Sequence, residues 1–144
     1  MKYIHIISGL IGMFLAVVIE ALGGWDKSLE LLFVVMVSDY LTGIMCAISG
    51  KSKKCSGLNS YIGFKGLCKK ATMLIVVWVA SDISSVARLS EIKELTGFSA
   101  IREIFIFAFI SNELISITEN CGLMGVPIPK KIMNVIDVLK ERIE

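Results

Sequence analysis

Residues 29–49 read LELLFVVMVSDYLTGIMCAIS, an apolar stretch in which Glu30 and Asp39 are the charged residues. About 20 residues of helix cross the ~30 Å hydrocarbon core of a bilayer, because each residue adds ~1.5 Å. Lipid offers no partner for backbone N–H and C=O groups, so a spanning segment of this kind must be helical. Residues 29–49 therefore predict a transmembrane helix.

Three further segments of similar length and composition lie at residues 4–24, 67–87 and 98–120. The chain is 55% hydrophobic and its mean hydropathy is +0.75. A soluble chain of this size cannot bury so much apolar surface in one core. We predict an all-α membrane protein with four transmembrane helices in a single membrane domain, residues 1–144. The first segment is interpreted as a retained helix rather than a signal peptide, because it is long enough to span and Glu20 spoils a cleavage site.

The last part of the chain has a different character from the four apolar segments. Pro127 and Pro129 prevent the fourth helix from continuing, and Pro129 suits the first turn of a new helix. We expect an amphipathic cytoplasmic helix over residues 130–144, with an apolar side that includes Ile132, Ile136 and Leu139. That side either lies on the membrane or on the protein's own helices, or it joins copies of the chain; periodicity does not separate these alternatives.

Lysine and arginine are unevenly distributed between the two predicted sides of the membrane. If the N-terminus is cytoplasmic, eleven of these residues fall inside and three or four outside. Cytoplasmic loops carry an excess of Lys and Arg, so both termini are expected in the cytoplasm. Most of the excess lies in and just after the polar loop at residues 50–66. This cytoplasmic basic loop contains Lys51, Lys53, Lys54, Lys65, Lys69 and Lys70.

Each predicted span carries an acidic residue, which is costly at membrane depth. One interpretation is structural: the acids hydrogen-bond to neighbouring helices or are protonated. The other is that their faces line water in an assembled state, while in the monomer the acids are paired or buried against one another. The candidates for pore lining or helix packing are Glu20, Asp39, Gly43, Asp82, Asn112, Glu113, Ser116, Glu119 and Asn120.

The first apolar segment also carries a stripe of small residues. Gly9, Gly12 and Ala16 recur at helical spacing on one face, together with Glu20. Small residues let helix backbones approach closely in lipid. The stripe is expected either to pack within the chain or to join copies of it.

Composition excludes several function classes. No Ser/His or Ser/Lys nucleophile pair, Cys/His metal set or Gly-rich phosphate loop is evident, so we predict neither an enzyme nor a cofactor. The four cysteines form no C-x-x-C pair and are interpreted as free thiols. The net charge of +2 gives no indication of nucleic-acid binding.

Four stretches together resemble one known family. DYLTGI at residues 39–44 resembles a D-x-x-T-G motif, and NSYIGFKG at 59–66 resembles S-x-x-G-x-x-G. NELISITEN at 112–120 is similar to N-E-x-x-S-x-x-E-N, and GVPIPKK at 125–131 to G-V-P-x-P-K. In this order the motifs are those of the bacteriophage and toxin-secretion holin family, to which the clostridial toxin-release holins belong. The first apolar segment carries no motif.

The resemblance implies a holin that forms homo-oligomers in the bacterial cytoplasmic membrane and opens lesions. A cell-wall hydrolase (endolysin) or a toxin would then leave the cytoplasm, as a functional rather than a direct partner. Membrane lipid and other copies of the chain are the expected direct partners. Two alternatives stay open: a small ion channel or transporter subunit, and an antiholin-type inhibitory membrane partner.

Overall fold

The computed structural model describes residues 2–52, 57, 59–89 and 93–141, and this part of the chain is helical throughout apart from turns and connections. Lys53, Lys54, Cys55 and Arg142 lie outside the described residues. The elements, in chain order, are α1 (Lys2–Ala21), α2 (Lys27–Ile48), α3 (Ser60–Leu89), the 3-10 helix η1 (Lys93–Ala100), α4 (Ile101–Met124) and α5 (Lys130–Glu141). The prediction of an all-helical protein is thus confirmed.

Within the described residues, α1, α2 and α3 are long and apolar enough to cross a membrane. α4 has 24 residues but carries charged residues at both ends and in the middle. They are Arg102, Glu103, Glu113 and Glu119.

Two helices extend further than hydropathy predicts. α3 begins at Ser60 rather than near Leu67, because the Asn59 side chain accepts hydrogen bonds from the backbone N–H groups of Tyr61 and Ile62 and caps the helix. Lys65, Lys69 and Lys70 therefore belong to a helix and not to a loop. α4 continues past Asn120 to Met124 and ends at Gly125, whose φ of 88° is the left-handed conformation that favours glycine.

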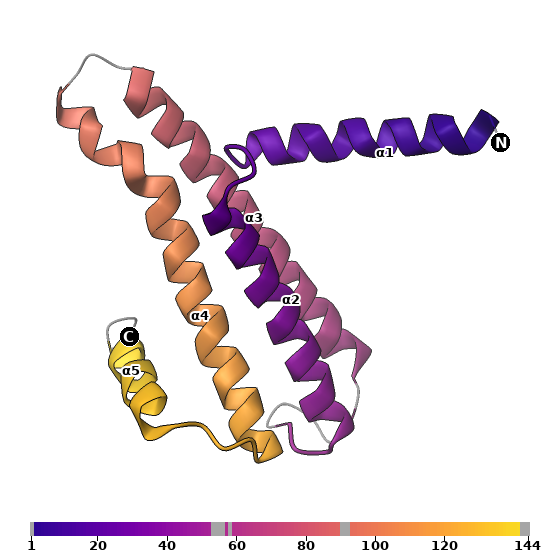
Figure 1. Ribbon diagram of the computed structural model, residues 1–144, viewed down its shortest axis with the longest axis vertical. Coiled ribbons are helices and arrows are strands. Elements are labelled where there is room, and N and C mark those ends of the chain that lie inside the picture. The colour runs from indigo at the N-terminus through magenta and orange to yellow at the C-terminus, as the bar shows by residue number, and fades with distance from the viewer. Residues whose placement is uncertain (1, 53–56, 58, 90–92, 142–144) are drawn as a thin grey trace.

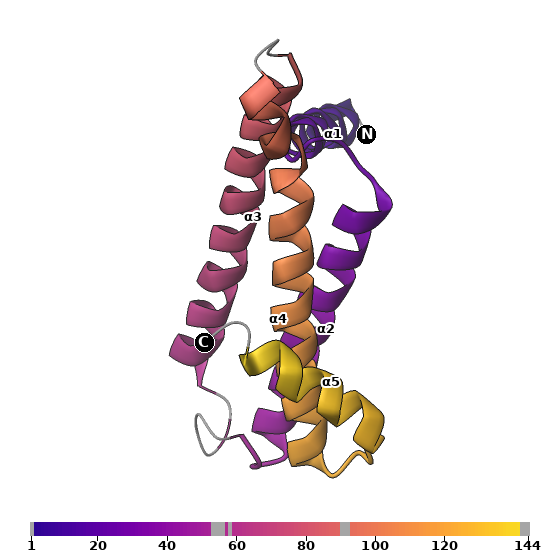
Figure 2. The same ribbon diagram turned by 90° about the vertical axis from the view of Figure 1, so that its left-hand side faces the viewer.

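α2, α3 and α4 form a bundle, and α1 projects sideways from it (Figure 1). In the view turned by 90°, α5 folds back across the C-terminal part of α4 (Figure 2), with Ile136 buried. The bundle core is apolar and comes from all three helices. It contains Leu29, Leu32, Val35, Met36, Val77, Ile106 and Ile110, together with Leu22 from the turn that follows α1.

The outward faces of the bundle are also apolar. Val34 and Val37 on α2, Ile75 and Val79 on α3, and Phe107 on α4 are all about half exposed. A soluble bundle would place polar residues at such positions. These faces are suited to contact with lipid acyl chains, as the sequence predicts.

The turn between α1 and α2 is closely packed. Gly23 and Gly24 have φ values of 91° and 89°, and Asp26 caps α2 by accepting a hydrogen bond from the Leu29 backbone N–H at 2.8 Å. A Cβ atom at Gly23 would lie 2.6 Å from both Arg102 Nε and Ser81 Oγ, whereas at Gly24 it would meet nothing within 4 Å. Only Gly23 is therefore required by space as well as by backbone conformation.

We predict that Gly23→Ala lowers the free energy of unfolding by roughly 2–4 kcal/mol, since it adds a steric clash to left-handed strain. Gly24→Ala is the matched control and should cost about 1 kcal/mol, because it adds strain alone. Denaturation of the purified variants in detergent micelles measures both. Equal losses for the two variants would show that the Arg102 contact does not restrict this turn.

Candidate functional site

A buried lysine joins the three helices of the bundle. Lys70 of α3 is only 8% exposed, and its Nζ lies 2.8 Å from Asp39 Oδ2 of α2 and contacts Glu113 of α4. The neighbouring Lys69 has a side chain that is 60% exposed, and its Nζ is 4.0 Å from Glu113 Oε1. The cluster around Lys70 thus combines one carboxylate from α2, one carboxylate from α4 and two ammonium groups from α3.

A cavity of about 190 Å³ adjoins this cluster. We call it the Lys70 pocket. Its lining comes from α2, α3, α4 and the connection between α2 and α3. It includes Asp39, Tyr40, Gly43, Ser52, Asn59, Gly63, Gly66, Lys70, Ser116, Glu119 and Asn120.

Helical spacing explains why these side chains converge. Residues separated by three or four positions lie on one face of a helix. This spacing relates Asp39 to Gly43 on α2, and Glu113 to Ser116 and Asn120 on α4. The Asn120 amide donates to Thr42 Oγ1 at 3.3 Å, which joins the motifs of residues 39–44 and 112–120 across the α2–α4 interface.

The lining glycines keep the pocket open on the α3 side. Gly63 and Gly66 precede Lys70 on one face of α3 and both line the pocket. A Cβ at Gly63 would stand 3.6 Å from the Tyr40 hydroxyl. The S-x-x-G-x-x-G stretch was expected to belong to the loop at residues 50–66. In the structure it forms the first turns of α3.

The structure gathers most, but not all, of the residues singled out from the sequence. Asp39, Gly43, Ser116, Glu119 and Asn120 line the Lys70 pocket, and the Asn112 amide lies 3.5 Å from Glu113 Oε1. Glu20 at the end of α1 and Asp82 on α3 are exposed and lie outside it. Asp82 points away because Ser81 and Ser84 are the buried residues of that turn.

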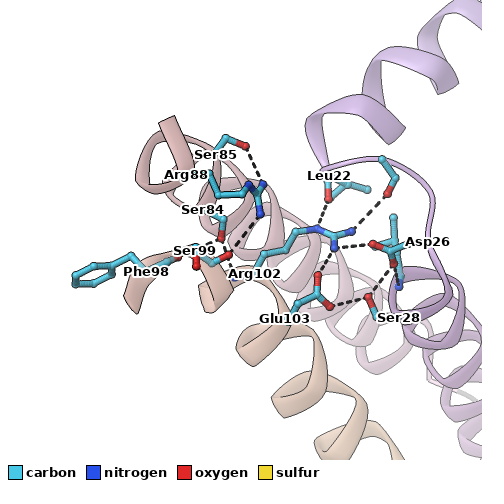
Figure 3. Close-up of polar contacts among 12 residues, drawn as sticks. Leu22, Asp26, Ser28, Ser84, Ser85, Arg88, Phe98, Ser99, Arg102 and Glu103 are labelled. Carbon is cyan, nitrogen blue, oxygen red and sulfur yellow. Dashed lines mark hydrogen bonds and ion pairs between the residues drawn. The ribbon is translucent and has the colours of Figure 1, made fainter. Parts of the chain in front are cut away.

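A second charged cluster lies at the opposite end of the bundle (Figure 3). Arg102 is 5% exposed. Its Nε donates to the Leu22 carbonyl at 2.7 Å, and its Nη1 donates to Asp26 Oδ2 at 2.7 Å and contacts Glu103. Ser28 Oγ lies 2.8 Å from Glu103 Oε2. Arg102 therefore ties the α1–α2 turn to the start of α4.

Sequence analysis missed both central cations. Lys70 is grouped with the cytoplasmic basic residues although the apolar segment at 67–87 already contains it, and Arg102 lies in the segment at 98–120 without being singled out. The available signal was indirect. A charged residue at the start of an apolar segment, with acids on the facing helices, needs a buried partner.

The Asp26 carboxyl lies in the turn, outside the apolar segments, and its pKa is perturbed. Burial acts to raise this pKa, but hydrogen bonds from the Leu29 backbone amide, Ser28 and Arg102, with the Arg102 charge, outweigh it. The pKa therefore lies below its ordinary value of 3.8.

In the part of the chain that the structure describes, no group of three His, Cys, Asp or Glu residues is placed to hold a metal ion. Cys46, Cys68 and Cys121 are free thiols.

Comparison with known proteins identifies relatives over most of the chain. The sequence model of the bacteriophage holin family matches residues 16–141. An uncharacterized 14.9 kDa protein from the nagH 3′ region of Clostridium perfringens is 37% identical over 83% of this chain and 82% of that protein. The probable holin of Bacillus phage phi105 is 31% identical over 81% of this chain and 77% of that protein. No solved structure matches the chain.

We predict that acid weakens the Arg102 cluster. A carboxyl group with a depressed pKa in the folded state stabilises the protein above its unfolded pKa, and this contribution is lost as pH falls through the folded pKa. Wild-type protein should exceed Asp26→Asn in stability by up to about 1 kcal/mol at neutral pH, since the group is partly exposed, and the difference should shrink below pH 3.8. Denaturation at several pH values measures it; a difference independent of pH would contradict the assignment.

We also predict that Lys70→Met prevents stable folding, with a loss of roughly 3–5 kcal/mol, because it leaves Asp39 without its counter-charge and Glu113 with only the mostly exposed Lys69. Lys69→Met is the matched control and should cost under about 1 kcal/mol, since that side chain is mostly exposed. Adding Asp39→Asn and Glu113→Gln to Lys70→Met should restore much of the loss. The protein level in membranes and denaturation in detergent measure the stability of the two single variants and of the triple variant. Equal effects of the two lysine variants would contradict the role of Lys70.

Proposed function

The chain belongs to the bacteriophage holin family, a family of non-enzymatic membrane proteins, and we propose that it forms lesions in the bacterial cytoplasmic membrane. Through them a cell-wall hydrolase or a toxin leaves the cytoplasm. The observation that carries the proposal is the family match over residues 16–141, which contains every residue that lines the Lys70 pocket.

The proposed topology has four spans with both termini in the cytoplasm. The distribution of Lys and Arg supports this orientation. At ~1.5 Å per residue, α4 is about 36 Å long and exceeds the hydrocarbon thickness. α1 has no buried residue in its most apolar window, so lipid is a better environment for it than water. For the protein to have four spans, α1 must turn about Gly23 and Gly24 until it lies alongside the bundle.

Self-assembly is proposed to use faces that this chain leaves uncovered. Within the described part of the chain, no atom of another helix lies within 4 Å of the Cβ positions of Gly9 and Gly12, and Ala16 is exposed. α5 buries Ile136 but leaves Ile132 half exposed; the side chain of Leu139 lies outside the described part. Packing of α1 stripes between copies would be close, as small residues allow.

Lesion opening is proposed to exchange the contacts of Lys70 for water. In a closed protomer the ammonium of Lys70 neutralises charge on Asp39 and Glu113. If the bundle opens and these faces line an aqueous lesion, water hydrates the same groups at little cost. The lesion then needs no chemistry, only a rearrangement of helices.

Inducible expression of this chain alone in bacteria tests the function. We predict a sudden loss of membrane potential together with release of a cytoplasmic reporter enzyme. Asp39→Leu should still insert, because the Lys70–Glu113 contact remains, but should abolish lysis or shift its time. Asp82→Leu is the matched acid control, because Asp82 lies outside the pocket, and should have the smaller effect.

Depolarisation without release of the reporter would support a small channel instead. No effect on the cells would support an inhibitory partner of the antiholin type. Lysis of the Asp39→Leu strain at the wild-type time would remove Asp39 from the proposed mechanism.

A further inference from the structure

The Lys70 pocket lies towards the end of the bundle where α2 and α3 are connected. Ser52 and Asn59 of the α2–α3 connection and Leu123 in the last turn of α4 form its outer lining. Its inner end is formed by Asp39 and Lys70. Asp39 lies nine residues before Ile48, the last residue of α2, so the pocket reaches about 13 Å into the bundle at ~1.5 Å per residue.

Beyond Lys70 the interior is closed by apolar side chains. From Asp39 towards the start of α2 the inward residues are Met36, Val35 and Leu32, and from Glu113 towards the start of α4 they are Ile110 and Ile106. Val77 fills the same layer from α3, and Leu32, Val77 and Ile106 are 0% exposed. Among the buried residues of α4, the next polar one is Arg102. It is eleven residues from Glu113, or about 16 Å at ~1.5 Å per residue.

The charges at the inner end are not balanced by Lys70 alone. The titratable groups that line or contact the pocket are Asp39 and Tyr40 from α2, Lys70 with the more exposed Lys69 from α3, and Glu113 and Glu119 from α4. One buried ammonium lies between two carboxylates, Asp39 and Glu113. The second cation, Lys69, has its Nζ 4.0 Å from Glu113 Oε1 but is mostly exposed. Charges held in a low dielectric are costly unless water also solvates them. A cavity of about 190 Å³ whose lining includes Asp39, Lys70 and Glu119 has room and polar partners for several water molecules.

We propose that the Lys70 pocket is a water-filled inlet. It opens on the side of the membrane that carries Lys51 and ends at Asp39, Lys70 and Glu113. Water and small hydrophilic cations reach these residues from that side alone, because the layer around Leu32, Val77 and Ile106 closes the path to the Arg102 cluster. The proposal rests on the proposed membrane orientation for assigning the open side to the cytoplasm.

Cysteine accessibility in membrane vesicles tests the inlet. The full-length chain, with its four natural cysteines replaced, carries one new cysteine at a time: Ser116→Cys or Asn120→Cys in the pocket, and Ile106→Cys in the apolar layer. Leu114→Cys is the matched control, because Leu114 lies at nearly the same depth on α4 but is exposed on the outside of the bundle. Lys51→Cys reports which side of the membrane the opening faces. The probe is a small, membrane-impermeant, positively charged methanethiosulfonate.

The expected result is modification of Ser116→Cys and Asn120→Cys in inside-out vesicles, at least tenfold faster than Leu114→Cys and Ile106→Cys. In right-side-out vesicles these pocket positions should stay unmodified. The proposal is overturned if both pocket positions react no faster than Leu114→Cys, or if they react from the side opposite to Lys51→Cys. If Lys51→Cys and the pocket positions all react only in right-side-out vesicles, the inlet is supported and the proposed orientation is wrong.

Discussion

The contact of one buried ammonium with two carboxylates fixes how the three bundled helices meet. In lipid, apolar side chains gain little from packing against one another rather than against acyl chains, so polar contacts and close packing decide which faces associate. Lys70, Asp39 and Glu113 each come from a different helix. Rotating any of them would leave a charge unpaired in the bundle, which is far more costly than exchanging one apolar face for another.

The family motifs acquire a physical meaning from this contact. Asp39 and Glu113 supply the charge, Gly63 and Gly66 supply the space, and Asn120 bonds α4 to α2 through Thr42. Arg102 joins elements in the same way at the other end of the bundle. It binds the α1–α2 turn through hydrogen bonds to Leu22 and Asp26. In the proposed mechanism a protomer with both ends held in this way is closed, and assembly into a lesion would release at least one of them.

Sequence alone predicted the helical class and the family, because runs of about 20 apolar residues and ordered motifs are properties of the chain itself. It placed the starts and ends of helices less well, since hydropathy marks the hydrocarbon boundary and not the last hydrogen bond. α3 begins at Ser60, capped by Asn59, in a polar region that hydropathy assigns to a loop. The partner of Asp39 could not be predicted, because Lys70 comes into range only through the register of α3 against α2. Helical spacing can be worked out from the sequence, and it relates Asp39 to Gly43, and Glu113 to Ser116 and Asn120.

The apolar layer between the two charged clusters has an electrical consequence. If water reaches Lys70 from one side and the Arg102 cluster borders the other, the insulating part of each protomer is about 16 Å of protein, by the ~1.5 Å rise of a helix, instead of the ~30 Å of lipid around it. The transmembrane field is then concentrated across Leu32, Val77 and Ile106. A charge displaced over this short distance crosses nearly the whole potential, worth about 2.3 kcal/mol per 100 mV. A small displacement of a charge in the bundle would then release as much electrical energy as a much longer displacement through a uniform field.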